Sequence, residues 1–331
     1  MDDLDLDART GLRWAPLLRT DLPDLARLYE VTTAHDEDPE RQSLPMLEEF
    51  VDSPRSRPAE DVRAGRSEDG TLVAVAWAGC NRSITEVRRV HLGGAVHPAW
   101  RRRGIGGAVL AWQLAHARAW DEATREPGHG PLVARLYAPV GQGDVRDLAT
   151  RHGLEVARYF TEMARPLTDL PAPRDVPGVR LVDLDLARSA EIHRVLDTAF
   201  ADHWGHADRT DDVWADQIGS SVVRPAWSVM ALDEGTGAIV GVALSCAYEQ
   251  DWAAEGRSQG YTDELGVLRS HRGRGVATAL LVDSMHRFAA AGLDSAGLGV
   301  DTANPSGALG LYRSLGYTDE AATCVHEWSR P

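Results

Sequence analysis

The two halves of the chain repeat the same order of apolar patterns. In each half, a short apolar segment is followed by a stretch whose apolar residues recur with the period of an amphipathic helix, over roughly residues 22–33 and 187–200. Later in each half, a longer stretch with the same period predicts a second helix, over residues 106–120 and 276–291. The pattern therefore predicts two copies of one fold.

Between these helices, each half contains a β-branched run bounded by turn residues, at 71–78 and 238–247. Such runs are typical of strands, and the acidic, glycine-containing segments SEDG and DEGTG before them predict hairpin turns. Each half is expected to close with a strand, a short helix and a final hairpin. Because there are too few βαβ crossovers for a doubly wound sheet, the sequence predicts an α+β fold.

A proline-rich segment marks the boundary between the copies. The stretch from Arg165 to Gly178 holds four prolines, which fix φ and remove backbone donors, as suits an extended linker. We therefore expect an N-terminal domain over residues 1–166, a linker over 167–177 and a C-terminal domain over 178–331. The copies align at Arg101 with Arg272, which indicates a tandem duplication rather than a solenoid.

The charge of the chain narrows the possible partners. A net charge of −15 over 331 residues argues against a nucleic-acid surface, which needs clustered basic charge. The same charge fits a cationic substrate slightly better than an anionic one. All 35 basic residues are arginine, so lysine chemistry of the Schiff-base or Walker type is excluded.

Other sequence features exclude further classes. The three cysteines lie far apart, so neither a disulfide framework nor a metal site is expected. No apolar run approaches the ~20 residues that span a bilayer. The acidic N-terminal segment does not resemble a signal peptide. We expect a cytoplasmic protein without a membrane partner, and the oligomeric state stays open.

Both halves carry the pattern R-x-x-G-x-[GA] directly after a strand and at the start of the long helix. The residues that form it are Arg101, Gly104 and Gly106 in the first half and Arg272, Gly275 and Ala277 in the second. Small residues let the backbone approach a pyrophosphate, and the N–H groups of the first helical turn bind the anion. Arginine adds a charge-assisted contact. A helix start that needs small residues only for packing is the alternative, which the repetition of the motif disfavours.

The sequence resembles the GNAT N-acetyltransferase superfamily. The resemblance lies in GVLRSHRGRGVATALL from Gly266 and in GVDTANPSGALGLYRSLGYTDE from Gly299, and the layout resembles the two-domain group that includes mycothiol synthase. It covers nearly the whole chain, more strongly in the second half. The resemblance implies two GNAT folds, each a mixed, splayed, largely antiparallel sheet flanked by helices. It also implies acetyl-CoA as the acyl donor, bound where the sheet splits.

The resemblance further implies which residues bind the donor. Strand residues near Val267 would bind the pantetheine arm through their backbone, and the Arg/Gly turn would bind the pyrophosphate. The expected residues of the second copy are Leu265, Gly266, Val267, Leu268, Arg272, Gly273, Arg274, Gly275, Val276, Ala277, Thr278, Asn304 and Tyr312. A possible second CoA site in the first copy comprises Val96, Arg101, Arg102, Arg103, Gly104 and Gly106.

Tyr312 and Asn304 are the downstream candidates of the second copy. In the family the tyrosine donates a proton to the departing thiolate; a thiol of pKa ~8.5 leaves as thiolate, and a phenol of pKa ~10 can protonate it or hydrogen-bond to it. The alternative is that Tyr312 is a core aromatic beside Leu311 and Leu315. Asn304 can bind a ligand amide or act as a turn or N-cap residue.

The second copy also offers a candidate base for the acceptor amine. In the family the base, or the water that it holds, lies on the strand before the Arg/Gly turn, and Asp263 and Glu264 are four and three residues before Val267. Because side chains alternate along a strand, at most one of them faces the site. The resemblance favours Asp263, with Glu264 as the second choice and a solvent-facing pair of acids as the alternative.

The first copy lacks these groups. When it is aligned on Gly153 with Gly316, Ala149 occupies the position of Tyr312, and Gly141 that of Asn304. Leu92 stands four residues before Val96, where a base would be. Catalysis is therefore expected in the C-terminal domain only.

The acceptor is expected to enter between the end of the first helix and the end of the 238–247 strand. The candidate substrate residues there are Asp202, His203, Trp204, Glu249 and Trp252, which combine aromatic and acidic groups suited to an amine. Helix termination and packing explain His203 and Trp204 equally well. The favoured function is acetyl transfer from acetyl-CoA to a small-molecule amine. The alternatives are a non-catalytic acyl-CoA or amine sensor, and a protein N-acetyltransferase.

Overall fold

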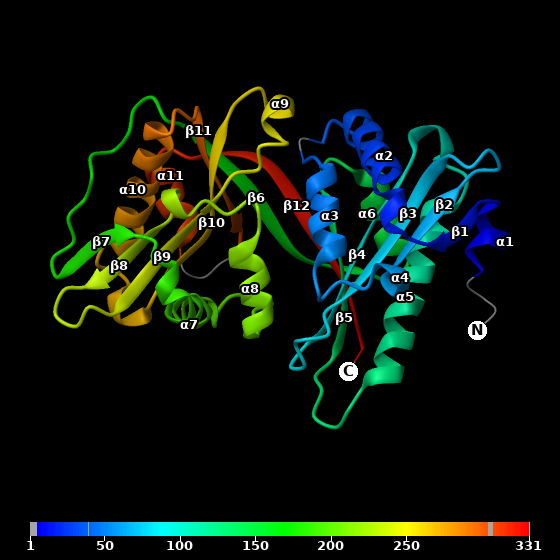
Figure 1. Ribbon diagram of the computed structural model, residues 1–331, viewed down its shortest axis with the longest axis horizontal. Helices are drawn as coiled ribbons and strands as arrows, with labels where there is room; N and C mark the ends of the chain where they lie inside the picture. Colours follow the sequence, from blue (N-terminus) through cyan, green and yellow to red (C-terminus); the bar gives the residue numbers. More distant parts are fainter. Residues whose placement is uncertain (1–4, 39, 304–306, 331) are drawn as a thin grey trace. The chain divides into compact units, whose positions relative to one another are not determined.

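The computed structural model describes residues 5–38, 40–303 and 307–330, and it divides the chain into two compact units (Figure 1). Unit 1 comprises Met1–Arg158 together with Thr323–Pro331, and unit 2 comprises Tyr159–Ala322. The chain therefore passes between the units twice, once inside the strand β6 (Glu155–Pro166) and once inside the strand β12 (Thr318–Arg330).

Unit 1 contains one mixed sheet with the strand order β1-β2-β3-β4-β5-β12. Its other strands are β1 (Arg13–Pro16), β2 (Val62–Arg66), β3 (Leu72–Cys80), β4 (Arg88–Val96) and β5 (Leu132–Pro139). Among the described strands of this unit, only β4 and β5 pair in parallel. The helices are α1 (Leu6–Thr10), α2 (Leu22–His35), α3 (Leu44–Asp52), α4 (Pro58–Asp61), α5 (Ile105–Thr124) and α6 (Gly143–Arg151).

Alternation along β3 explains how this sheet is covered on both faces. Val75 packs in the apolar cluster that includes Leu25 and Leu28 of α2, whereas Ala74 and Ala76 pack with residues of α5 such as Val109. Neighbouring strand residues point to opposite faces, so the run is buried on both sides. This explains why residues 71–78 are apolar at nearly every position.

Unit 2 repeats this architecture with the strand order β6-β11-β10-β9-β8-β7. Its other strands are β7 (Val179–Asp183), β8 (Val229–Asp233), β9 (Ile239–Cys246), β10 (Gln259–Val267) and β11 (Ser295–Asp301). The helices are α7 (Ser189–Phe200), α8 (Asp211–Gly219), α9 (Trp252–Glu255), α10 (Val276–Ala290) and α11 (Ala308–Ser314). Leu244 of β9 packs with Leu196 of α7, and Ala243 packs with Leu280 of α10.

Each sheet splits at the same place. In unit 2, β10 and β11 pair in parallel only over Gln259–Tyr261 and Ser295–Gly297, although both strands continue beyond. In unit 1, the parallel pairing of β4 and β5 stops at Leu92 and Leu136. The mixed, splayed sheet and the α+β class that the resemblance implied are thus confirmed.

The closing strands differ from the sequence expectation. Each copy ends in one long strand rather than a hairpin, because β6 pairs with β11 of unit 2 and the end of β12 pairs with β5 of unit 1. The expected domains, residues 1–166 and 178–331, each end in a strand that joins the sheet of the other half. The strand β6 completes the sheet of unit 2, and the end of β12 completes the sheet of unit 1. Local patterning did not show this because strand pairing is a long-range interaction.

The proline-rich stretch after β6 also packs more closely than an open linker would. Val176 is buried against β7 and α10, and the Pro171 carbonyl oxygen lies 2.9 Å from His286 Nε2. Arg165 is itself part of β6, where its side chain donates to the Leu315 and Asp169 carbonyls. The segment therefore packs against its own unit.

Candidate active site

The Arg/Gly turn of unit 2 has the geometry of an anion site. Gly273 and Gly275 adopt positive φ values of 72° and 88°, and Gly275 caps α10 without a side-chain hydrogen bond. This leaves N–H groups of the first turn directed away from the helix, where the helix dipole favours an anion. A Cβ at Gly275 would lie 3.1 Å from the Arg174 guanidinium. The turn thus fits the diphosphate of a CoA thioester.

Arg272 holds this turn in place. Its Nε donates to the Val267 carbonyl over 3.0 Å, and its Nη2 donates to the Ala199 carbonyl at the end of α7 over 2.8 Å. In unit 1, Arg101 Nε donates in the same way to the Val96 carbonyl, over 2.9 Å. Each arginine therefore ties its turn to the preceding strand, which leaves the backbone N–H groups as the principal anion donors.

The open edge of β10 suits the pantetheine arm. From Glu264 to Val267, one edge of β10 is paired with β9, and among the described residues the other edge has no partner strand beyond Tyr261. An unpaired strand edge can hydrogen-bond an extended ligand that carries amides. Gly266 faces α7, where a Cβ would lie 3.0 Å from Ala199 Cβ, so this glycine brings α7 close to the strand.

Tyr312 lies on α11 in the apolar core of unit 2, beside Leu298 and Val300 of β11. Its ring meets that of Tyr317 edge-on at 6.2 Å between centroids, and burial raises the pKa of Tyr312 to about 12. The phenol is therefore protonated at neutral pH and able to donate. Asn304, the other expected downstream residue, lies outside the described residues.

Asp263 is the extra residue of a β-bulge in β10. Thr262 pairs with Ser245 and Glu264 with Leu244, which leaves Asp263 without an opposing residue. Tyr248 Oη donates to Asp263 Oδ1 over 3.3 Å. Solvent reaches the carboxylate, but dense surrounding protein, reinforced by the charge of Glu264, raises the pKa of Asp263 to about 6. Bulges re-aim side chains next to active sites.

Glu264 is engaged in a different way. Its Oε1 accepts hydrogen bonds from Arg209 Nη1 and Gln217 Nε2, each over 2.6 Å. Arg209 also pairs with Asp197 of α7 at 2.6 Å. Glu264 therefore links β10 to α7 and α8 through a largely buried arginine, whereas Asp263 has no arginine partner in the part of the chain that the structure describes. Alternation alone could not separate the two, because the bulge interrupts it.

The expected acceptor residues fall into two groups. Asp202 forms an ion pair with Arg269 beside the turn; the His203 ring packs on Phe200 at 4.4 Å, and Trp204 packs on Phe160 at 6.4 Å. On the other side, Glu249 pairs with Arg224 at 2.7 Å, and Trp252 starts α9. Burial, reinforced by Arg272, lowers the pKa of His203.

A surface cavity of about 490 Å³ lies between the end of α7 and the turn after β10. It is lined by Thr198, Ala201, Leu268, Arg269 and Ser270. These residues border the Arg/Gly turn rather than Asp263, so the cavity lies on the side of the site where the donor is expected. It identifies no acceptor pocket.

Two groups near Asp263 were missed from the sequence. Tyr261 precedes the bulge by two residues and donates to Glu162 over 2.7 Å. Glu162 lies on β6, which chain order assigns to the N-terminal copy, so no local signal could place it here. Only the pairing of β6 with β11 brings it to this site.

Unit 1 has neither a phenol nor a carboxylate at the positions equivalent to Tyr312 and Asp263. Ala149 and Leu92, which stand where Tyr312 and the base would be, are both buried in the apolar core. The N-cap of α5 is nevertheless preserved, with Gly104 at a φ of 81°. The turn of unit 1 therefore has the backbone geometry of an anion site without a phenol or carboxylate at these two positions.

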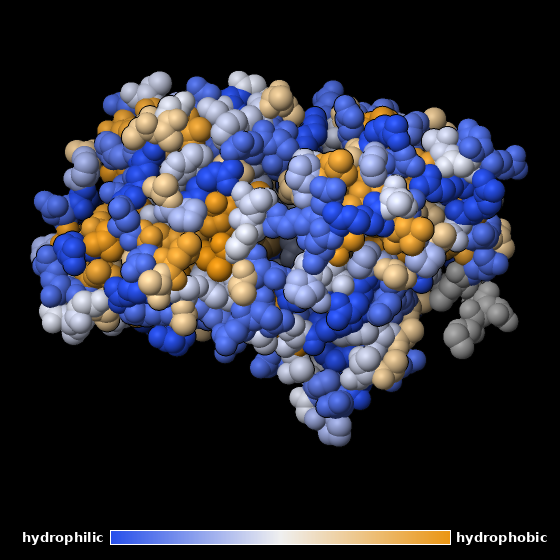
Figure 2. Space-filling model, in the orientation of Figure 1, coloured by the Kyte–Doolittle hydropathy of each residue, from blue (hydrophilic) through white to orange (hydrophobic). Residues whose placement is uncertain are grey.

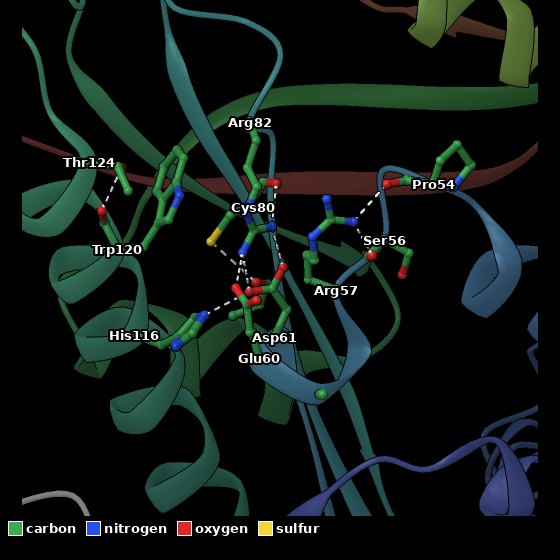
Figure 3. Close-up of polar contacts among 12 residues, drawn as sticks. Pro54, Ser56, Arg57, Glu60, Asp61, Cys80, Arg82, His116, Trp120 and Thr124 are labelled. Carbon is green, nitrogen blue, oxygen red and sulfur yellow. Dashed lines mark hydrogen bonds and ion pairs between the residues drawn. The ribbon is translucent and has the colours of Figure 1, made fainter.

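Unit 1 does bring together three possible metal ligands that the sequence did not indicate. Atoms of Asp61, Cys80 and His116 lie within 4.8 Å of one another (Figure 3). However, both oxygens of Asp61 accept from Arg82, over 2.7 and 3.0 Å, and burial with the charge of Asp61 raises the pKa of the Cys80 thiol. The Arg82 guanidinium already pairs with the carboxylate that would bind a metal ion, and the Cys80 thiol stays protonated. These residues therefore fit an ion-pair network.

Figure 2 shows one face of the molecular surface, and most of this face is hydrophilic. In unit 2, hydrophobic residues gather on it over the region of β8 and β9. Among the described residues, no helix is both long and apolar enough to cross a membrane.

Comparison with known proteins decides the family. Residues 189–317 match the model of the Acetyltransferase (GNAT) family. The mycothiol acetyltransferase of Thermobispora bispora is 34% identical over 233 residues, which cover 67% of this chain and 70% of that protein. The chain belongs to the GNAT acetyltransferase family. A second mycothiol acetyltransferase, from Mycolicibacterium smegmatis, is 32% identical over 67% of this chain and 70% of its own length.

Solved structures agree with this GNAT assignment. A GCN5-related N-acetyltransferase from Sphaerobacter thermophilus superposes with a TM-score of 0.77 at 21% identity, covering 97% of this chain and 96% of that one. A tandem GNAT protein from the clavulanic acid biosynthesis pathway gives a TM-score of 0.68 at 16% identity, covering 97% and 99%. The two-domain GNAT layout is thus confirmed. The protein is an acyltransferase, and the donor that its family uses is acetyl-CoA.

Proposed function

We propose that this GNAT protein transfers the acetyl group of acetyl-CoA directly to a primary amine of a small molecule, and that unit 2 performs the reaction. The observation that carries the proposal is the position of Asp263. Its carboxylate stands at the bulge where β10 leaves β11, on the strand that ends at the Arg/Gly turn. The same unit supplies Tyr312.

The chemistry follows from these groups. A primary amine of pKa ~10.4 is mostly protonated at neutral pH, so it must lose a proton before it can attack. Asp263, with its pKa raised to about 6, accepts that proton through a water. The amine nitrogen then forms a bond to the thioester carbonyl carbon, the carbon–sulfur bond breaks, and the nitrogen releases its second proton to solvent as the amide forms. Tyr312 donates its phenolic proton to the leaving thiolate, and solvent restores the phenol.

Two further observations support a small-molecule acceptor and a single catalytic unit. The matched relatives are named for a small molecule, mycothiol, rather than for a protein substrate. In unit 1, Ala149 and Leu92 replace the phenol and the carboxylate. We infer that unit 1 supports the fold or holds a second CoA without turnover.

A thiol-release assay with acetyl-CoA and a panel of amines tests the reaction. Amine-dependent release of CoA is expected, together with an acetylated amine in the mass spectrum. An absence of amine-dependent release across the panel, with tight acetyl-CoA binding by calorimetry, would overturn transfer to these amines and favour a sensor. Release that requires peptide N-termini would favour a protein acetyltransferase.

A matched pair of glycine variants tests the assignment to unit 2. Gly104 and Gly275 both cap a long helix at positive φ, so alanine strains each backbone by about 1–2 kcal/mol. Gly275→Ala is expected to raise the KM for acetyl-CoA about tenfold, because the N–H groups of α10 shift. Gly104→Ala should leave kcat and that KM within about twofold. A larger change in kcat or in this KM for Gly104→Ala than for Gly275→Ala would assign the reaction to unit 1.

A further inference from the structure

Glu162 stands beside the candidate active site although it belongs to the strand that closes the N-terminal copy. In β6 it pairs with Gly299 of β11. Alternation places Met163 on the α10 face, where it packs with Leu281 and Met285. Glu162 therefore faces the opposite side of the sheet, the side covered by α7.

Gly299 makes room for this carboxylate. A Cβ on Gly299 would lie 2.8 Å from Tyr261 Oη and 3.0 Å from Glu162 Oε1. The two side chains meet above the glycine, where Tyr261 donates to Glu162 Oε2 over 2.7 Å. Among the described residues, Oε1 has no hydrogen-bond partner. One oxygen is thus held in place while the other stays available to a ligand.

No cation from the described residues neutralises Glu162. Burial raises its pKa, and the nearby charge of Glu320 adds to that effect; the hydrogen bond from Tyr261 is the opposing influence. The neighbouring arginine, Arg257, pairs with Glu320 and with Glu255 instead. A partly buried carboxylate without a cation is costly, and a cationic ligand would remove that cost.

The surroundings of Glu162 connect it to Asp263. The rings of Tyr248 and Tyr261 meet edge-on at 5.4 Å between centroids; the first binds Asp263 and the second binds Glu162. Glu162 and Asp263 lie on the two strands that flank β11, and the charge of Glu162 contributes to the raised pKa of Asp263. The two carboxylates are therefore linked through the tyrosine pair and influence each other's charge.

An aromatic wall completes this side. Phe160 lies two residues before Glu162 on the same face of β6, and its ring packs 6.4 Å from that of Trp204. Trp204 was already a candidate acceptor residue from the sequence. Aromatic faces and a carboxylate together suit an ammonium group carried on an apolar or cyclic body.

We propose that Glu162 binds a second ammonium group of the acceptor, so that the substrates of this site are small molecules with two amino groups. This inference rests on the proposed function, because it assigns the acceptor of the same site. One amine is acetylated beside Asp263, and the other pairs with Glu162 Oε1. A purely structural role for Glu162, as an acceptor of the Tyr261 hydrogen bond, is the alternative to exclude.

The test compares matched amines on the full-length protein. Butane-1,4-diamine and butylamine are compared by their kcat/KM values, and 4-aminobutanol replaces the second ammonium by a hydroxyl. The wild type is expected to prefer the diamine by about tenfold or more, and Glu162→Gln should reduce that ratio toward one. Glu162→Asp should restore part of the preference, because it retains the charge.

Controls separate the possible failures. Glu234→Gln removes an exposed carboxylate from the β8–β9 turn and should keep the wild-type ratio. Thermal denaturation and the KM for acetyl-CoA report whether the Glu162 variants fold. Acetylation of both amines by the wild type with a ratio near one, or a ratio unaltered in Glu162→Gln, overturns the inference and leaves the proposed function intact. A wild type that acetylates no amine at all refutes the proposed function itself.

Discussion

Arg209 Nη1 lies 2.6 Å from Glu264 Oε1, and this ion pair separates the roles of two adjacent carboxylates. The side chains of Arg209 and Glu264 are only 14% and 15% exposed. Glu264 is therefore held by a cation, whereas Asp263 accepts from the Tyr248 phenol. The bulge accounts for this contrast, because it leaves Asp263 at the split of the sheet while Glu264 contacts residues of α8 and of the segment before it.

The first prediction concerns the base. Asp263→Asn is expected to lower kcat/KM for the amine about 100-fold, in the range of general acid–base contributions, with little change in the KM for acetyl-CoA. Glu264→Gln keeps its hydrogen-bonding shape and should lower kcat/KM by less than about tenfold. Steady-state kinetics of both variants at neutral pH decide which carboxylate is the base. A larger loss in Glu264→Gln would assign the base to Glu264.

The pH dependence follows from the raised pKa of Asp263. The base must be ionised, so kcat/KM for the amine should rise with pH and lose its steep slope above about 6. The same limb should be missing from Asp263→Asn, because that side chain does not titrate. A profile of kcat/KM from about pH 5 to about pH 9 for both proteins measures this. An unchanged acidic limb in the variant would assign it to another group.

The Arg209 network predicts a large effect on stability. Arg209→Ala removes the cation that pairs with both Asp197 and Glu264, and breaking a largely buried pair in this way costs about 3–5 kcal/mol. Arg313→Ala is a suitable control, since the Arg313–Asp319 pair is about half exposed and such pairs contribute ~0–1 kcal/mol. Urea denaturation of both variants compares the free energies of unfolding. Equal losses would show that the Arg209 network is not structural.

The role of Tyr312 as general acid can be tested against the neighbouring buried tyrosine, Tyr317. Tyr312→Phe should lower kcat about 10- to 100-fold through loss of the general acid, while the KM for acetyl-CoA stays the same. Tyr317→Phe removes a buried hydroxyl that lacks a partner among the described residues and should leave kcat unchanged. If the two variants behaved alike, Tyr312 would be a packing residue only.

Local patterns predicted much of this fold. The helices expected over residues 22–33 and 276–291 occur as α2 (Leu22–His35) and α10 (Val276–Ala290), because apolar periodicity and capping glycines act within one element. The Arg/Gly turns were predicted from spacing for the same reason. The pairing of β6 with β11 was not predicted, because it joins residues that are far apart in the chain. Glu162 was hidden for that reason, and the bulge at Asp263 was hidden because an extra residue leaves no compositional mark.

The last prediction separates two roles that an arginine can have in the Arg/Gly turn. If charge alone attracts the donor, Arg272→Ala and Arg274→Ala should raise the KM for acetyl-CoA equally, because each removes one positive charge from the same turn. Arg272 also bridges the Val267 and Ala199 carbonyls, whereas Arg274 donates to the Pro177 carbonyl, outside the strand and helix that form the site.

We therefore expect Arg272→Ala to raise that KM about tenfold beyond Arg274→Ala, and to lower stability by about 1–2 kcal/mol through its lost charge-assisted hydrogen bonds. Such a loss corresponds to roughly 2–8 °C in Tm for a domain of this size. Differential scanning fluorimetry and donor titrations measure both quantities. Equal KM values with no difference in Tm would show that Arg272 acts through charge alone. A lower Tm without a difference in KM would show that Arg272 only holds α7 against β10.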